Sequence, residues 1–380
     1  MAKLKVCSVF GTRPEAIKMA PVVLELLRRE ECEHRLIVTG QHRAMLDQML
    51  ALFGLKPDYD LNIMLARQTL TQITTRALEG MMNVLEEARP DVVLVHGDTT
   101  TSFVASLAAY YSQIPIGHVE AGLRTGERYN PFPEEMNRRL TDALADIYFA
   151  PTRAAKEQLI RENVEPRRIF VTGNTVIDAL LMVAGRDEPP DLLPDVPPDA
   201  DVVLVEAHRR ENLGDPMREI CRALMDVVRA EPNVRIVFPV HLNPAVRDTV
   251  FESLDGEPRV HLLPPQDYLP FVMLMKRAKV ILTDSGGIQE EAPSLKRPVL
   301  VLRTATERPE AVAARTAILL GHNRAKIADT TLRLLRDAAF YKEATSSANP
   351  YGDGHAASRT ADALLYFFNH SQTPPREFSP

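Results

Sequence analysis

The sequence predicts two α/β domains, each built around a parallel sheet. Short stretches rich in Val, Ile and Leu alternate with amphipathic helical patterns along the chain, and such alternation is typical of parallel sheets joined by helical crossovers. A segment with five prolines and no periodicity, residues 186–200, interrupts the alternation, which restarts beyond it. With 380 residues, 45% of them hydrophobic, the chain is long enough for two cores of ordinary size.

The expected strands of the N-terminal domain are apolar almost throughout, as strands covered on both faces of a sheet are. They span residues 4–11, 34–40, 91–98, 114–121, 146–152 and 167–174. Helical periodicity predicts helices between them, among others at residues 14–30, 71–89 and 131–145. We therefore place this domain at residues 1–185.

The C-terminal half repeats the pattern after the Pro-rich linker at residues 186–200. Its expected strands span residues 201–208, 234–241, 259–265, 279–287 and 297–303. The second domain is therefore placed at residues 201–355. A last amphipathic stretch, residues 356–370, is expected to form a C-terminal helix that packs back towards the N-terminal domain.

Composition excludes several classes of function. The net charge is −6 with both signs mixed along the chain, so nucleic acid is not an expected partner. The three cysteines are odd in number and widely spaced, which argues against a disulfide framework or a metal site and suits a reducing cytoplasm. No stretch approaches the roughly 20 apolar residues that span a bilayer, so we expect no membrane association.

The polar residues that follow the strands are candidates for function, because ligands of parallel sheets bind outside the carboxyl ends of the strands. After the first strand, Gly11 suits a tight turn, and Arg13 and Lys18 place cations near a helix start, where an anion is favoured. The alternative is that these are ordinary surface charges. The pattern is not G-x-G-x-x-G, so a nicotinamide or flavin cofactor is not indicated.

Later strands end in further polar groups. Asp98 is either a carboxylate of a binding cleft or the N-cap of the next helix. The run Ser285, Gly286 and Gly287 lets backbone N–H groups approach phosphate oxygens, with Glu291 in reach of a ribose, although a plain glycine-rich turn would look similar. His208 begins a cationic cluster that would suit the same diphosphate.

The stretch "HVEAGLRTGERYNPFPEEMNRR" carries many charges just where a strand leaves the core. Glu120 ends the strand. Glu134 stands at a predicted helix start, and Arg138 lies one turn later, where we expect the two to pair. Glu135 and Arg139 lie further round the helix and are expected to be solvated.

Taken together, the motifs resemble a known family. They include "GTRPEAIKMAP", "HGDTTTS", "HVEAGLRTGERYNPFPEEMNRRLTD", "AHRRENLG", "DSGGIQEEAPSLKRPVLVLR" and "NPYGDGHAASR". In this order, from about residue 5 to about residue 368, they resemble the non-hydrolysing UDP-N-acetylglucosamine 2-epimerases of bacteria. The resemblance implies a glycosyltransferase-B type fold, with two Rossmann-like domains around a cleft. It also implies a cytoplasmic homodimeric isomerase without cofactor or metal, which interconverts UDP-N-acetylglucosamine and UDP-N-acetylmannosamine for surface polysaccharides.

The resemblance also assigns roles to residues. The residues implied to hold the nucleotide and its phosphates are Arg13, Lys18, Gln266, Phe271, Ser285, Gly286, Gly287, Glu291 and Arg308. The residues implied to surround the sugar as catalytic groups are Asp98, Glu120, Glu134, Arg138 and His208. A second UDP-N-acetylglucosamine, bound as an allosteric activator, would contact Gln41, His42, Gln68, Glu134, Arg209 and His241.

The chain departs from the family pattern at a few positions. Glu206 stands where Thr is usual, and a carboxylate there is expected to raise the pKa of His208. Arg315 stands where Gly is frequent, and Ala44 where Gln or Glu is common. The competing functions are a hydrolysing epimerase that releases N-acetylmannosamine, a glycosyltransferase of the same fold, and a UDP-sugar binding protein without activity.

Overall fold

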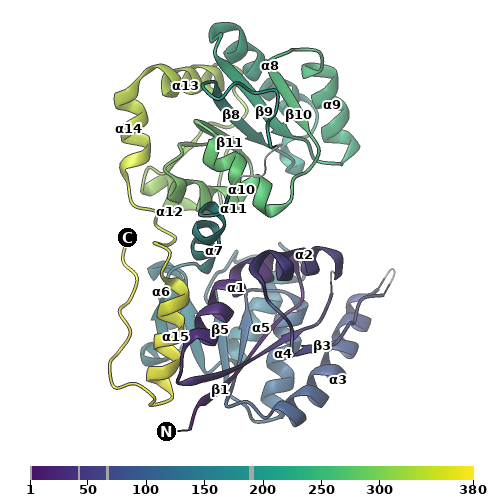
Figure 1. The fold of residues 1–380 in the computed structure, drawn as a ribbon, viewed down its shortest axis with the longest axis vertical. Helices are drawn as coiled ribbons and strands as arrows, with labels where there is room; N and C mark the ends of the chain where they lie inside the picture. The colour runs from purple at the N-terminus through teal and green to yellow at the C-terminus, as the bar shows by residue number, and fades with distance from the viewer. Residues whose placement is uncertain (1, 42, 66–67, 188–191) are drawn as a thin grey trace. The chain divides into compact units, whose positions relative to one another are not determined.

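The computed structural model describes residues 2–41, 43–65, 68–187 and 192–380, and the chain divides into two compact units. Unit 1 comprises Met1–Ala179 and Tyr351–Ser379, and unit 2 comprises Leu180–Pro350 with the final Pro380. Each unit holds one parallel sheet with helices packed against it (Figure 1). The predicted α/β class with two parallel-sheet units is confirmed.

Unit 1 contains a seven-stranded sheet in the order β3-β2-β1-β4-β5-β6-β7. Its strands are β1 (Leu4–Phe10), β2 (Cys32–Val38), β3 (Tyr59–Asp60), β4 (Val92–His96), β5 (Ile116–Val119), β6 (Ile147–Ala150) and β7 (Ile169–Val171). Its helices are α1 (Arg13–Arg28), α2 (Arg43–Phe53), α3 (Leu70–Ala88), α4 (Thr100–Tyr111), α5 (Glu134–Leu144), α6 (Arg153–Arg161), the 3₁₀ helix η1 (Pro166–Arg168) and α15 (Ala356–Phe367). Helix α7 (Thr175–Ala184) contains the boundary between the units.

Unit 2 contains a six-stranded sheet in the order β10-β9-β8-β11-β12-β13. Its strands are β8 (Asp201–Glu206), β9 (Val234–Pro239), β10 (Val260–Leu263), β11 (Val280–Thr283), β12 (Val299–Val301) and β13 (Ala317–Leu319). Its helices are η2 (Arg210–Asn212), α8 (Asp215–Ala230), α9 (Pro244–Leu254), α10 (Tyr268–Arg277), α11 (Gly286–Glu291), η3 (Ala292–Leu295), α12 (Pro309–Ala313), α13 (Arg324–Arg336) and α14 (Ala338–Ser346).

Every strand that the sequence predicts is present, and β3 and β13 are additional edge strands. These two are short, two and three residues long, so no sustained apolar pattern marks them. β10 is also an edge strand, and its residues are only partly buried, which differs from the fully covered strands at the centre of the sheet.

The two sheets share one topology. In each, the chain starts at a central strand, moves outward to one edge, and then returns to build the other side. The direction changes between β1 and β4 in unit 1 and between β8 and β11 in unit 2. In open parallel sheets this switch point is where ligands bind, at the carboxyl ends of the two strands. The turns after these four strands therefore position many of the candidate site residues, and segments after neighbouring strands carry others, such as Glu120 after β5 and Arg308 after β12.

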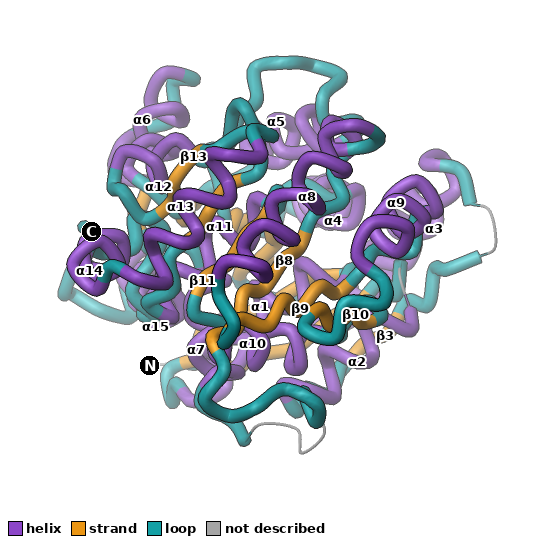
Figure 2. Tube along the Cα trace, turned by 90° about the horizontal axis from the view of Figure 1, so that it is seen from above, coloured by secondary structure: helices purple, strands orange, loops and turns teal. Residues whose placement is uncertain are grey.

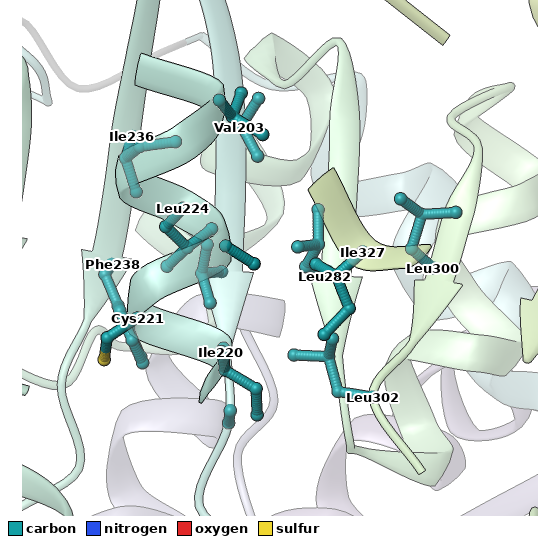
Figure 3. Packing of buried hydrophobic residues seen from close by; sticks show 14 of the residues in the cluster. Val203, Ile220, Cys221, Leu224, Ile236, Phe238, Leu282, Leu300, Leu302 and Ile327 are labelled. Atoms are coloured by element: carbon teal, nitrogen blue, oxygen red, sulfur yellow. The ribbon is translucent and has the colours of Figure 1, made fainter. Parts of the chain in front are cut away.

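The core of unit 2 is formed by apolar side chains of the sheet and of the helices that cover it. Val203, Ile236 and Leu282 from the strands contact Leu224 of α8 and Ile327 of α13, and all are fully buried (Figure 3). Figure 2 shows the strands β8, β9 and β10 as neighbours, and α8 packs against β9. Burial of this apolar surface stabilises the sheet whose carboxyl edge carries the polar turns.

The C-terminal segment belongs to unit 1, where α15 packs against α1 (Figure 1). The buried Asp178 carboxylate accepts hydrogen bonds from the backbone N–H groups of Ala356 at 3.2 Å and Ala357 at 2.8 Å, which caps the start of α15. Phe378 N donates to Val171 O at 2.7 Å. Among the helices in the described part of the chain, none is long and apolar enough to cross a membrane.

Candidate functional site

The turn after β1 is held by one buried carboxylate. Glu15 accepts hydrogen bonds from Gly11 N at 3.1 Å and Thr12 N at 2.9 Å, and on its other oxygen from Thr99 Oγ1 at 2.6 Å and Ser102 Oγ at 2.9 Å. Thr99 is the N-cap of α4, so Glu15 joins the turns after β1 and β4. Sequence reasoning missed this residue, although its position three residues after Thr12 is the signature of a capping box.

Gly11 is required for space rather than for backbone conformation. A Cβ added there would lie 1.9 Å from Thr39 Oγ1 and 2.7 Å from Thr101 Oγ1. The turn at Gly11 does not require a left-handed backbone conformation, because Gly11 is not among the residues with positive φ. The predicted cations follow directly, with Arg13 at the first position of α1 and Lys18 on its second turn.

Glu120 is the most constrained of the predicted carboxylates. It follows β5 with φ of +67°, a conformation that L residues other than Gly rarely adopt. Its Oε2 lies 2.5 Å from Lys18 Nζ and accepts a hydrogen bond from Asn174 Nδ2 at 2.8 Å. Strained backbone of this kind persists where the surrounding structure holds it, and it clusters at functional sites. The structure thus brings together two predicted residues from distant segments, and adds Asn174.

Asp98 is not an N-cap, because Thr99 caps α4 instead. Its carboxylate forms an ion pair with Arg138, and its backbone carbonyl accepts from Asn137 Nδ2 at 3.0 Å. The expected pairing of Arg138 with Glu134 was therefore wrong. Arg138 also lies 3.4 Å from Glu135, so a bifurcated ion pair joins α5 to the turn after β4.

Glu135, rather than Glu134, is the buried and ion-paired carboxylate at the start of α5. Glu135, expected to be solvated, is 0% exposed, and its carboxylate accepts from Thr125 N at 3.0 Å and pairs with Arg139 at 3.1 Å. Glu134 keeps one buried carboxylate oxygen, Oε2, without a hydrogen-bond partner among the described residues. A buried acceptor without a partner is costly, so the catalytic role predicted for Glu134 is compatible with its surroundings.

A buried charged network braces the turns that carry Asp98 and Glu120. His118 places Nδ1 2.6 Å from Asp142 and Nε2 2.8 Å from the carbonyl oxygen of Gly97. Both partners are acceptors, so the geometry calls for an imidazolium that donates from both nitrogens. Burial opposes ionisation of Asp142, but His118 and Arg124 outweigh it and lower the pKa of that carboxyl.

His96, the last residue of β4, lies 4% exposed with Nε2 3.9 Å from Glu120. Both of its ring nitrogens lack a hydrogen-bond partner among the described residues. Burial lowers the pKa of His96 to about 3, against the favourable effect of Glu120. The ring is therefore neutral at physiological pH, and sequence reasoning did not single it out.

In unit 2 the glycine-rich turn lies beside a cation. A Cβ added at Gly286 would lie 3.7 Å from Arg308 Cζ, so the guanidinium flanks the Ser285–Gly287 turn. Arg308 is oriented by an ion pair with the buried Glu290. The loop is braced further by Gln289, which donates to Ser285 O at 3.1 Å. The structure thus joins predicted phosphate-binding residues from two separate segments.

Glu291 lies at the end of α11 and accepts a hydrogen bond from Tyr268 Oη at 3.2 Å. Tyr268 is the first residue of α10, which also carries Phe271, and Gln266 precedes it by two positions and donates to Pro264 O at 2.7 Å. The predicted nucleotide-binding residues Gln266, Phe271 and Glu291 therefore belong to one neighbourhood of unit 2. Tyr268 joins it as a residue that the sequence did not indicate.

The turn after β8 is tied to the turn after β11. Asp284 is fully buried, and its Oδ2 accepts from the backbone N–H groups of His208 and Arg209, both at 2.9 Å, and from Asn212 Nδ2 at 2.6 Å. The His208 ring lies 2.5 Å from Glu206 through Nδ1. This hydrogen bond raises the pKa of His208 despite partial burial, as the sequence predicted from the carboxylate at position 206.

Glu206, His208 and Asp284 also offer ligand atoms that lie within 4.8 Å of one another, which is a possible arrangement for a metal ion. Two ligands on one zinc-sized ion lie about 3 Å or more apart. The 2.5 Å separation of Glu206 and His208 is shorter and is that of a hydrogen bond. We therefore treat these residues as a hydrogen-bonded cluster.

The residues implied for a second ligand fall into two groups. In unit 1, Gln41 accepts from Thr101 Oγ1 at 3.0 Å, and Gln68 donates to Ile63 O at 2.5 Å. In unit 2, His241 stacks on His208 with ring centroids 5.1 Å apart, next to Arg209. His42 lies outside the described residues.

The departures from the family pattern differ in their surroundings. Arg315 adopts φ of +58° just after α12, a position where Gly is favoured, and its side chain is 79% exposed. Ala44 is exposed on α2. Only Glu206 contacts a predicted catalytic residue.

Two Rossmann-like units, each built on a parallel sheet, form the glycosyltransferase-B type of fold, and similar solved structures share it. A family model described as UDP-N-acetylglucosamine 2-epimerase matches residues 24–365. The chain belongs to the UDP-N-acetylglucosamine 2-epimerase family.

Its relatives cover nearly the whole chain. It is 54% identical over 369 residues to the UDP-N-acetylglucosamine 2-epimerase of Escherichia coli K12, covering 95% of this chain and 98% of the relative. It is 50% identical over 379 residues to the Bacillus subtilis enzyme of the same name, covering 100% of both. The crystal structure of UDP-GlcNAc 2-epimerase from Neisseria meningitidis bound to UDP-GlcNAc matches with a TM-score of 0.84 and 48% identity, covering 95% of this chain and 100% of that one.

Proposed function

We propose that this protein interconverts UDP-N-acetylglucosamine and UDP-N-acetylmannosamine without releasing the free sugar. The observation that carries the proposal is the pair of constrained carboxylates in unit 1. Asp98, in the turn after β4 at the switch point of the sheet, is paired with Arg138, and Glu120, directly after the neighbouring strand β5, is paired with Lys18 of α1. Family membership and the names of the relatives support the same substrate.

The chemistry explains why carboxylates and cations are needed together. The hydrogen on C2 of the sugar is not next to a carbonyl, so a side-chain base cannot remove it directly. When the C1–O bond to the diphosphate breaks, positive charge at C1 acidifies that hydrogen, and its removal gives a 2-acetamidoglucal and UDP. Proton delivery to the opposite face of C2 during re-addition of UDP inverts the centre. A nicotinamide route is not indicated, since the sequence has no G-x-G-x-x-G pattern.

We assign proton transfer to the carboxylates of unit 1. Asp98, Glu120 and Glu134 differ in environment, since the first two are ion-paired and the third has an unpartnered buried oxygen. Epimerisation needs two proton transfers, one from C2 and one to its opposite face, and a set of several carboxylates provides groups for both.

We assign the leaving diphosphate to cations and backbone N–H groups. In unit 2 these are the Gly286–Gly287 turn and Arg308, which the structure places side by side. Arg13 and Lys18 supply cations in unit 1. His208 would protonate the departing phosphate oxygen. Stabilising charge where it develops is commonly the largest contribution to catalysis.

The test is to incubate the protein with UDP-N-acetylglucosamine in D₂O without added cofactor and to follow the products by NMR. We expect deuterium at C2 and a mixture of two intact UDP-sugars. Free N-acetylmannosamine with UDP would instead identify a hydrolysing enzyme, and absence of labelling and of a second UDP-sugar would refute epimerisation.

A variant separates the carboxylate assignment from the overall reaction. Asp98→Asn keeps the size of the side chain but loses the charge that pairs with Arg138. We expect both epimerisation and C2 exchange to fall by about 10²-fold or more. Near-normal rates with the fold intact would show that Asp98 has no part in proton transfer.

We also propose that a second UDP-N-acetylglucosamine activates the enzyme and that the protein is a cytoplasmic homodimer that supplies surface polysaccharide precursors. If activation occurs, trace UDP-N-acetylglucosamine will accelerate the initial conversion of UDP-N-acetylmannosamine. A dimer will show a solution mass of twice the 42.5 kDa of the chain. Hyperbolic kinetics without acceleration would contradict the proposed activation. A solution mass of one chain would contradict the proposed dimer.

A further inference from the structure

The turn after β8 carries a carboxylate in direct contact with the ring of His208. Glu206 is the last residue of β8, and its Oε1 lies 2.5 Å from His208 Nδ1. The other oxygen, Oε2, accepts a hydrogen bond from Thr283 Oγ1 at 3.0 Å. Thr283 is the residue paired with Glu206 in the neighbouring strand β11. The carboxylate is therefore fixed from both sides before any ligand binds.

The contact with this fixed carboxylate determines which nitrogen of the His208 ring is available to a ligand. Because an ionised carboxylate only accepts hydrogen bonds, His208 Nδ1 must carry the proton in this contact. Nε2 has no hydrogen-bond partner among the described residues, and the His208 side chain is 33% exposed. Nε2 is thus the ring atom that can exchange a proton with a ligand. Glu206 is only 17% exposed, so its charge is poorly screened by solvent.

We propose that Glu206 is a positioning residue that holds His208 in one orientation and favours its imidazolium form for protonation of the leaving phosphate. The proposal rests on the proposed function for the reaction step and on the contacts that fix the Glu206 carboxylate between His208 and Thr283. The arrangement has the logic of a carboxylate that orients and stabilises a catalytic histidine.

The proton balance of the step is simple. As the C1–O bond breaks, its electron pair moves to the phosphate oxygen, and the Nε2 proton of the imidazolium transfers to that oxygen. The ring becomes neutral and keeps its Nδ1 proton, which remains hydrogen-bonded to Glu206. Re-addition of UDP to the glucal reverses the transfer and restores the imidazolium, so no external acid is consumed.

The other charged groups around His208 act in opposing directions. Asp284 Oδ1 lies 4.0 Å from Nδ1 and favours the imidazolium, whereas Arg209 opposes it. His241 stacks on the His208 ring, with the two ring centroids 5.1 Å apart. The hydrogen bond that Glu206 accepts from His208 Nδ1 is the largest influence and raises the pKa of His208. A raised pKa means that the imidazolium is fully present at low pH and is lost as pH rises through the raised value.

The direct test is an NMR titration of the His208 ring in the full-length protein, between about pH 5 and pH 9. A spectrum of His208→Asn assigns the resonance. Glu206→Gln retains a neutral acceptor of similar shape, and Glu206→Thr removes the carboxylate and shortens the side chain. Asp201→Asn is the matched control, because Asp201 is a partly buried carboxylate at the other end of β8, where it pairs with Lys279 at 3.0 Å.

We expect the titration midpoint of His208 to fall in Glu206→Gln and Glu206→Thr and to stay unchanged in Asp201→Asn. The alkaline limb of kcat should move to lower pH in the same two variants. On that limb kcat should fall by about tenfold with a smaller change in KM, and lowering the pH should restore it.

Each outcome is decisive. An unchanged midpoint in Glu206→Gln overturns the coupling between the two residues. A lower midpoint without movement of the alkaline limb overturns the role of Glu206 in the reaction. If the wild-type protein shows no epimerisation at all but the midpoint falls, the coupling stands and the proposed function is what fails.

Discussion

The turns after β1 and β4 in unit 1 and the turns after β8 and β11 in unit 2 occupy equivalent places in sheets of equivalent strand order, but they are built differently. In unit 1 charged side chains face one another, as in the ion pair of Arg138 with Asp98. Each region has a buried carboxylate that accepts two backbone N–H groups, Glu15 in unit 1 and Asp284 in unit 2, but in unit 2 the adjacent turn has glycines flanked by Arg308. Two sheets of the same topology therefore carry turns that are built differently.

This difference indicates that the two units contribute differently to function, although their sheets share one topology. Paired carboxylates and cations hold defined protonation states, which suits proton transfer. Glycines with a nearby guanidinium leave backbone N–H groups accessible, which suits binding of a phosphate. We therefore expect substitutions of the unit 1 carboxylates to act mainly on the rate of chemistry, and substitutions around the glycine turn of unit 2 to act mainly on affinity for the nucleotide. His208 and Glu206 of unit 2 are the exception, because we assign them to protonation of the leaving phosphate.

The largest expected effect compares one carboxylate from each region. Glu120→Gln should lower kcat by about 10²- to 10⁴-fold with little change in KM, because a proton-transfer group is lost. Glu291→Gln should raise KM by about tenfold with a smaller effect on kcat, because a hydrogen bond to a charged group is weakened. Steady-state kinetics of both variants, with circular dichroism to verify the fold, provides the measurement. If Glu120→Gln and Glu291→Gln both changed only KM, the proposal that Glu120 acts on the rate of chemistry and Glu291 on nucleotide affinity would be wrong.

The second effect concerns His96, the last residue of β4. Burial lowers the pKa of His96 to about 3, from the 6.5 of an exposed ring. The unfolded chain therefore binds a proton that the folded chain excludes. The contribution of His96 to stability is fully present above pH 6.5 and is lost as pH falls towards 3, by several kcal/mol at the acid end.

Denaturant unfolding of wild type and His96→Gln at several pH values provides the measurement. The free energy of unfolding of wild type should decline more steeply below pH 6.5 than that of the variant. His370→Gln, at a histidine just beyond α15, should follow wild type. Parallel curves for all three proteins would show that His96 does not titrate in this way.

The third effect compares a glycine from each region. Gly11→Ala places a Cβ 1.9 Å from Thr39 Oγ1, whereas Gly286→Ala places one no closer than 3.7 Å to Arg308. We expect the first to destabilise the protein by about 1–3 kcal/mol through overpacking and the second to leave stability nearly unchanged. Urea midpoints measure both. Equal midpoints for the two variants would contradict the view that only unit 1 needs glycine for packing.

The smallest effect tests a feature of unit 2 away from the turns. Arg315 has φ of +58°, and its 79% exposed side chain forms a 3.6 Å ion pair with Glu343. Exposed pairs contribute little, and the left-handed conformation costs a non-glycine residue about 1 kcal/mol. Arg315→Gly should therefore stabilise the protein by about 1 kcal/mol, seen as a raised thermal midpoint with unchanged activity. A lower midpoint would show that the ion pair dominates.

Much of this organisation could be predicted from the sequence because it depends on local pattern. Continuous apolar runs predicted the central strands, and the rule that ligands bind at strand ends selected Asp98, Glu120, His208 and the Ser285–Gly287 turn. The edge strand β3 could not be predicted, since its two residues carry no periodic signal. Its pairing with β2 depends on the fold already formed.

The ion-pair partners of the charged side chains could not be predicted from sequence spacing. Helical spacing favoured a Glu134–Arg138 pair, but Asp98, 40 positions earlier in the chain, takes Arg138 instead. Glu135 is buried because Thr125 N, Arg138 and Arg139 surround it. Side-chain choice among several charges depends on tertiary distances, which a one-dimensional pattern does not contain. The contact of Glu206 with His208 was foreseen because only one residue separates them.

The capping of α15 by Asp178 has a consequence for the order in which the protein is made. Unit 1 includes residues 351–379, so its helix α15 is synthesised after residues 180–350 of unit 2. Until that segment leaves the ribosome, the Asp178 carboxylate lacks the backbone N–H groups of Ala356 and Ala357, and α1 lacks its neighbour α15. The first-synthesised unit is thus completed last, and a nascent chain that stops at the end of unit 2 cannot assemble the whole of unit 1.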